Sequence, residues 1–183
     1  TVDALAWFEP MIADDGLLAV DECFNWEGGE VLWNFIDWQE GDEQLKGDPA
    51  RPALNGFYAL ALGTASELLE LAGRADDARA CAAQRDAVAG QLAARDDLGE
   101  HGIVAATLAG VVSGRMGEVA ALVRDRKART DIMFIFFTLK ALIQEGHADA
   151  AWTLLRDAFV PMMDAGHGTF WETRTVPDGS GRA

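Results

Sequence analysis

Cysteine, histidine and long hydrophobic runs are all scarce in this 183-residue sequence, and each scarcity excludes a class of protein. The two cysteines, Cys23 and Cys81, give no disulfide framework, so free buried thiols are expected and a reducing compartment such as the cytoplasm is favoured. The richest apolar run, residues 132–139, is much shorter than the ~20 residues of a membrane span. No basic segment followed by an apolar stretch opens the chain, so we expect no signal peptide.

Basic residues are also few. Lysine and arginine number 15 against 30 aspartates and glutamates, which gives a formal net charge of −15. This excess of negative charge disfavours nucleic acid and anionic membrane surfaces as partners, and it suits a neutral substrate. His101, His147 and His167 lack the spacing of metal ligands. Phosphate loops, dinucleotide fingerprints and nucleophile motifs are absent too, so neither a metal nor a cofactor is expected.

Apolar residues recur at helical spacing along most of the chain. Residues 52–72 form a stripe of this kind, with Pro52 suited to a first turn and Gly73 to a stop. Asp131 is expected to cap a later helix that ends at Gly146. Other helices are expected at residues 5–12, 78–94, 99–112, 117–124 and from His147 onward. These helices alternate between buried and half-exposed, which predicts paired helical hairpins around a common centre.

Three details of this pattern carry further expectations. The helix after Asp131 is apolar nearly all round and should be buried on most sides. In the last helix, a one-sided apolar stripe is predicted from Trp152, Leu155 and Phe159 to Met162 or Met163. Residues 14–44 break the helical pattern with an acidic, aromatic segment, and long loops of this kind often carry function.

Two carboxylates beside aromatic residues are candidates for chemistry. Glu172 follows Phe170 and Trp171 directly, where a charge is costly to desolvate unless it is paired or reactive. Asp37 lies inside the segment WNFIDW at residues 33–38. Glycoside hydrolysis needs two carboxylates across the scissile bond and flat apolar walls for the sugar, which these segments contain.

Both candidates also have plainer interpretations. Trp33 and Trp38 could be core aromatics, with Asp37 capping a helix or turn. Glu172 could form a salt bridge with Arg174 or Arg129. The residues alone leave these alternatives open.

Four segments in order resemble bacterial α-L-rhamnosidases. They are WNFIDW at 33–38, NGFYALAL at 55–62, Glu100-His101-Gly102 before an apolar helix with Gly110, and GTFWET at 168–173. Residues 141–166 resemble the helix pair that leads into the family's Thr-Trp-Glu segment. The resemblance is to the C-terminal part of the (α/α)6-barrel catalytic domain. It implies an all-α fold in which antiparallel helical hairpins form part of a six-hairpin toroid, with residues 1–183 as a partial domain.

The resemblance also implies residue roles. Family members invert the anomeric centre as they cleave terminal α-L-rhamnosyl units, and Glu172 matches their general base. Asp37, Trp38, Trp33 and Trp171 match substrate-binding positions. The family's general acid lies in an Arg-Asp-Glu-Arg segment that this chain lacks, a histidine-containing stretch after the base is missing, and Arg174 stands where the family often has an aromatic residue.

About seven of the twelve helices of such a barrel are expected here. The chain should therefore expose apolar faces that a second copy of the chain or the remainder of the same polypeptide would cover, and should be inactive alone. Two alternatives remain. One is a non-catalytic helical module that binds carbohydrate or another partner. The other is a helical repeat scaffold, favoured if Asp37 and Glu172 lie on different faces.

Overall fold

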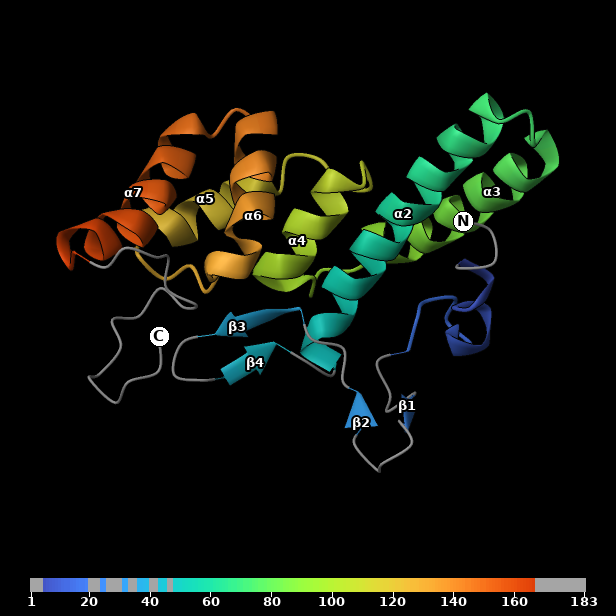
Figure 1. Cartoon of the computed structure of the whole chain (residues 1–183), viewed down its shortest axis with the longest axis horizontal. Helices are drawn as coiled ribbons and strands as arrows, with labels where there is room; N and C mark the ends of the chain where they lie inside the picture. The colour runs from blue at the N-terminus through green and yellow to red at the C-terminus, as the bar shows by residue number, and fades with distance from the viewer. Residues whose placement is uncertain are drawn as a thin grey trace.

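The computed structural model describes residues 5–19, 24–25, 31–32, 36–39, 43–45 and 48–166. Helices dominate, which confirms the predicted all-α class (Figure 1). Six α-helices follow one another after residue 50: α2 (Arg51–Leu71), α3 (Ala75–Ala93), α4 (Gly99–Leu108), α5 (Met116–Arg124), α6 (Ile132–Gln144) and α7 (Ala148–Asp164). Before them, β1 (Phe24–Asn25) pairs with β2 (Val31–Leu32), and β3 (Asp37–Gln39) pairs with β4 (Glu43–Leu45), both antiparallel. Two 3-10 turns, η1 (Glu9–Met11) and η3 (Asp48–Ala50), complete the described elements.

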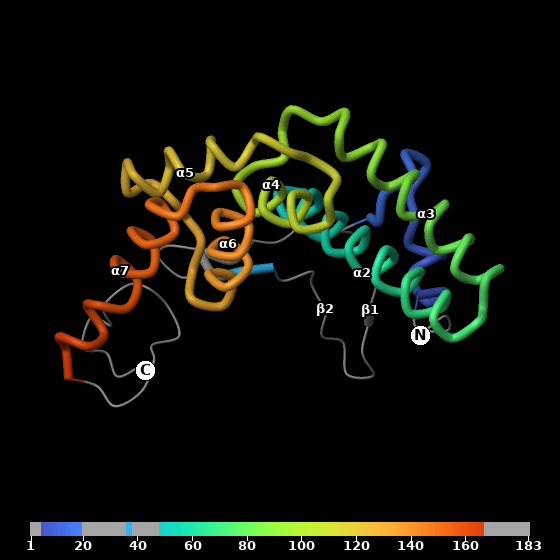
Figure 2. Tube along the Cα trace, turned by 90° about the horizontal axis from the view of Figure 1, so that it is seen from above, coloured from blue at the N-terminus to red at the C-terminus, as the bar shows by residue number. Residues whose placement is uncertain are grey.

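The six helices form three consecutive hairpins arranged in two rows. Helix α4 contacts α2 on one side and α6 on the other, so α2, α4 and α6 form an inner row. Helices α3, α5 and α7 lie behind them as an outer row, with α5 against α7. Figure 2 shows the rows bent into an arch. The predicted alternation holds for α2, α3 and α4, whose inner members are the more buried, but not for α6, which leaves large apolar side chains exposed.

Small residues let the inner helices approach closely. Gly102 in α4 lies against Pro52 in α2, where an added Cβ would come within 2.7 Å of the proline Cβ. Gly56 lies one turn further along α2, and a Cβ added there would come similarly close to Ala105 of α4. Helix α4 is buried from His101 to Thr107, as a helix enclosed on several sides must be.

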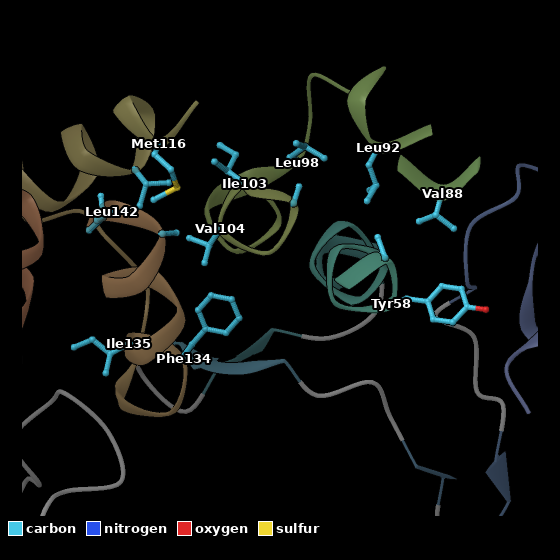
Figure 3. Packing of buried hydrophobic residues seen from close by; sticks show 14 of the residues in the cluster. Tyr58, Val88, Leu92, Leu98, Ile103, Val104, Met116, Phe134, Ile135 and Leu142 are labelled. Carbon is cyan, nitrogen blue, oxygen red and sulfur yellow. The ribbon is translucent and has the colours of Figure 1, made fainter. Parts of the chain in front are cut away.

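One hydrophobic core runs through both rows (Figure 3). Leu62, Val88 and Leu92 fill the space between α2 and α3, all with almost no exposed surface. Val104 of α4 and Phe134 of α6 point toward each other in Figure 3. Cys81 belongs to this core, so the expected buried free thiol is confirmed for it.

The predicted helix boundaries agree with local capping. Pro52 lies in the first turn of α2, and Gly73 follows that helix with φ of +73°. The Asp131 side chain accepts a hydrogen bond from Ile132 N at 2.7 Å and caps α6, as expected. Gly146 adopts φ of +81° after α6. The helix predicted for 99–112 is wrong at its end, because α4 stops at Leu108.

Two other expectations are corrected. Residues 5–12 do not form one helix: η1 contains Pro10, which has no N–H to donate, and Ile12 leaves the turn to form a β-bridge with Leu18. The segment 14–44 is not simply a loop, because the short strands β1 to β3 lie within it. Among the described residues, no helix has both the length and the apolar character needed to cross a membrane.

The expected faces of α6 and α7 are also wrong. Phe136 in α6 is 65% exposed, so that helix is not buried on most sides. In α7 the buried face consists of Ala150, Ala151, Leu154, Ala158 and Met162, while Trp152 is 65% exposed. Small alanines allow α7 to pack closely, and the larger apolar side chains flank that contact instead of filling it.

Candidate functional site

The predicted site residues fall only partly within the described structure. Asp37 is the first residue of β3, and Trp38 follows it in the same strand, opposite Gln44 of β4. Trp33, Trp171 and Glu172 lie outside the described residues, as does Arg174. The proposed pairing of Asp37 with Glu172 across a sugar therefore stays a prediction.

Asp37 is completely buried, with 0% of its surface exposed. One oxygen, Oδ2, accepts two hydrogen bonds: one from His101 Nε2 at 2.8 Å and one from the backbone N–H of Asp131 at 2.8 Å. With Asp37 as a carboxylate, which can only accept, the tautomer of His101 that carries a proton on Nε2 is the one that fits this contact. The other oxygen, Oδ1, has no hydrogen-bond partner among the described residues. A carboxylate that contacts a sugar needs an oxygen that the sugar can reach, and Asp37 has no exposed surface. Direct sugar binding by Asp37 therefore also stays a prediction.

His101 links Asp37 to the helical core. It lies in the first turn of α4 and is 5% exposed. Its ring packs on Phe134 of α6, with ring centroids 4.5 Å apart. Three elements, β3, α4 and α6, therefore meet at this one side chain.

Carboxylates accept from the backbone N–H groups of four consecutive residues, 129–132, at the start of α6. Glu100 accepts from Arg129 N at 2.7 Å and from Thr130 N at 3.0 Å. Asp37 accepts from Asp131 N, and the Asp131 side chain accepts from Ile132 N. The N–H groups of the N-cap residue Asp131 and of Ile132 are thus satisfied by negative groups, the sign that the helix dipole favours at a helix N-terminus.

Two hydroxyl groups extend this network. Thr130 Oγ1 donates to Glu100 Oε1 at 2.6 Å and lies 3.0 Å from Thr138 Oγ1. Thr130 and Thr138 are both fully buried. We call Asp37, Glu100, His101, Thr130 and Asp131 the α6 entry cluster.

The entry cluster joins β3, α4 and α6 through buried hydrogen bonds. Its central pair, Asp37 and His101, has almost no exposed surface. Among the residues that the structure describes, no three His, Cys, Asp or Glu side chains are grouped so that they could bind one metal ion. The cluster can therefore hold neighbouring segments in place.

Sequence reasoning found only part of this cluster. Asp131 was predicted as a helix cap, and the cap interpretation of Asp37 is close to the structure, since Asp37 accepts from the N-cap amide of α6. The roles of Glu100 and His101 were missed. Apart from the resemblance, their sequence signal was a charged and a titratable residue in the first turn of a helix that is otherwise small and apolar.

A second feature is an apolar edge at one end of the arch, which we call the α6–α7 edge. It consists of the large apolar side chains that α6 and α7 leave exposed: Met133, Phe136, Ile143, Trp152, Val160 and Met163. Beside it lies a shallow hollow of about 430 Å³ lined by Arg126, Arg156, Asp157, Val160 and Pro161. In this hollow, Asp157 Oδ2 lies 3.5 Å from Arg126 Nε, and Asp157 Oδ1 lies 3.6 Å from Arg156 Nη2.

Comparison of the chain with protein-family models, with curated proteins and with solved structures finds no match.

Proposed function

We propose that this chain is the C-terminal part of the (α/α)6-barrel catalytic domain of an inverting glycoside hydrolase that resembles α-L-rhamnosidases, with Glu172 as its general base. The observation that carries the proposal is the arch of three consecutive hairpins in two rows. An (α/α)6 barrel consists of six hairpins whose inner and outer helices alternate in this way. Three of them account for half of such a ring.

The course of α7 and the position of β3 support the same assignment. Because α6 and α7 form a hairpin, the end of α7 returns toward the side on which α6 begins (Figure 1). Strand β3, with Asp37 and Trp38, contacts α6 on that side. Glu172 is six residues beyond Gly166, a stretch that spans at most ~22 Å. The proposal requires that Glu172 and β3 serve one site at this end of the inner row.

The exposed α6–α7 edge supports an incomplete ring. Single apolar side chains are common on protein surfaces, but six large ones on two adjacent helices are expected where another element packs. In the proposed barrel the next hairpin of the same polypeptide would cover this edge.

The proposed reaction divides the work between two carboxyl groups. Glu172 would remove a proton from water as the water attacks the anomeric carbon, and an acid outside this chain would protonate the leaving oxygen. In inverting enzymes these groups lie about 6.5–9.5 Å apart so that water fits between sugar and base. Trp33, Trp38 and Trp171 would supply apolar surfaces against the terminal α-L-rhamnosyl unit.

Substitution of Glu172 by glutamine in the complete protein tests the proposal. Turnover of an aryl α-L-rhamnoside should fall by about 10²–10⁴-fold, because glutamine cannot accept the proton from water. Binding of L-rhamnose should persist in an isothermal titration. The exposed Glu70→Gln substitution on α2 should leave turnover unchanged. Near-normal turnover in Glu172→Gln would overturn the assignment.

A second function is favoured by one observation: the chain has no Arg-Asp-Glu-Arg segment and thus lacks the acid of the resembled family. A helical module that binds carbohydrate without cleaving it would have this property. The complete protein would then bind L-rhamnose or rhamnosides in a titration but release no aglycone from an aryl α-L-rhamnoside.

A further inference from the structure

We propose that His101 is a positioning residue, which acts through Asp37 to hold the β3–β4 hairpin, and with it Trp38, across the starting ends of α4 and α6. The catalytic consequence of this role rests on the proposed glycoside hydrolase function. The structural part does not, because it follows from the contacts of β3 alone.

The β3–β4 hairpin is too small to be held by its own hydrogen bonds. Each strand has three residues, in the register Asp37–Leu45, Trp38–Gln44 and Gln39–Glu43. Isolated two-stranded hairpins are marginally stable at best in water. The hairpin therefore depends on its attachment to the helices.

Asp37 provides that attachment through a single oxygen. Oδ2 binds both His101 and the Asp131 backbone, residues that are 64 and 94 positions away in the sequence. Since β3 contacts α6, this oxygen joins the strand to the first turn of α4 and to the N-cap of α6 at once.

His101 is essential to this attachment because of the burial of Asp37. A fully buried carboxylate is costly unless hydrogen bonds replace its water. Since Oδ1 has no partner, the two donors on Oδ2 are all that replaces water in the described structure. Loss of His101 would leave one donor, and the least costly response is for Asp37 to move toward solvent, taking β3 and Trp38 with it.

Substitutions at His101 in the complete protein separate this role from simple core packing. Glutamine places an amide N–H near the position of Nε2 and can still donate to Asp37, whereas leucine fills the space without a donor. Thr107→Val is the matched control, because Thr107 is buried in the same helix and its hydroxyl has no partner among the described residues.

The first readout is hydrogen exchange of residues 37–45, followed peptide by peptide. His101→Leu should speed exchange in this segment by about 10-fold or more while helices α2 and α3 keep their protection. His101→Gln and Thr107→Val should stay within about 3-fold of the natural protein. Equal acceleration in all helices, or no acceleration in residues 37–45, would overturn the proposal.

The second readout is kinetic and uses an aryl α-L-rhamnoside. His101→Leu should raise KM by about 10-fold with a smaller effect on kcat, and His101→Gln should restore KM. An unchanged KM in His101→Leu would overturn the positioning role in the enzyme. If the natural protein shows no turnover, the proposed function fails, whereas the exchange measurement still decides the role of His101.

Discussion

Gly56 of α2 lies so close to Ala105 of α4 that a Cβ at position 56 would be 2.6 Å from the Ala105 Cβ and 2.8 Å from its carbonyl carbon. Real Cβ atoms essentially never approach other atoms this closely. Ala105 has no exposed surface and cannot move away without shifting the α4 backbone. This contact sets the distance between two inner helices.

Gly56→Ala is therefore expected to lower the free energy of unfolding by about 1–3 kcal/mol, the usual cost of overpacking a tight core. Gly63 is the matched control, because it lies in the same helix and a Cβ added there would meet nothing within 4 Å. Gly63→Ala should raise stability by about 0.5–1 kcal/mol through helix propensity. Urea denaturation of both variants measures the difference, and equal stabilities would contradict the close contact.

Asn55 is expected to anchor the N-terminal segment. Its Oδ1 accepts from Leu18 N at 2.7 Å, and its Nδ2 donates to Leu18 O at 3.1 Å. Asn55→Leu leaves the buried Leu18 N–H without an acceptor and should cost about 1–3 kcal/mol of stability.

The control for Asn55 is Ser66→Ala. Ser66 lies on the same helix as Asn55, and its substitution removes one hydrogen bond, to Ala78 O of α3. Its cost should be smaller, about 0.5–1.5 kcal/mol. Hydrogen exchange at Leu18 should accelerate in Asn55→Leu alone. Unchanged protection of that amide would argue against the anchor.

Tyr58 should titrate above the ordinary tyrosine pKa of 10.0, because burial raises its pKa and the charge of Glu9 raises it further. It is the only tyrosine in the sequence, so tyrosinate absorbance reports it alone. A raised pKa in the folded state means that the stability it contributes is complete below pH 10.0 and is lost as pH rises through the folded value.

The size of the Tyr58 shift has an internal control. Glu9→Gln should lower the pKa of Tyr58 without restoring the ordinary value, because burial is the larger cause. The centroid of the Tyr58 ring lies 5.6 Å from that of the Phe8 ring, and the Tyr58 hydroxyl accepts from Gln84 Nε2 of α3 at 2.8 Å. A folded protein whose tyrosine titrates at its ordinary pKa would show that the ring is not buried between these two residues.

The α6–α7 edge predicts that the 183-residue chain alone will self-associate, since large exposed apolar side chains on two packed helices favour association. Phe136→Glu should reduce association, as measured by sedimentation velocity. Leu71→Glu changes an exposed leucine at the end of α2, away from the edge, and should have little effect. If the unsubstituted 183-residue chain sediments as a monomer, the exposed side chains of the edge do not require another protein element packed against them.

Sequence reasoning succeeded where the deciding interactions are local. Pro52, Asp131 and Gly146 set helix ends through capping within one turn, so their neighbours in the sequence suffice to predict them. It failed at α7, where the buried face is decided by how closely α5 and α6 approach. Trp152 is more hydrophobic than Ala151, yet only the alanine is small enough for that contact.

Prediction of the site from the sequence is limited in the same way, and more strongly. Asp37 could be singled out because it lies among aromatic residues, but nothing local indicates that it accepts from His101 and Asp131. Those partners are brought to it by the packing of α4 against α6. The sequence therefore predicted which carboxylate matters more readily than what that carboxylate contacts.

The shared oxygen of Asp37 also has a consequence for the order of folding. Contacts within each hairpin join segments that are close in the sequence, and such contacts form quickly. The links from Asp37 to His101 and Asp131 close loops of 64 and 94 residues, whose entropy must be overcome first. The helical arch should therefore form early, with β3 docking last. Removal of this link should then accelerate unfolding more than it slows folding.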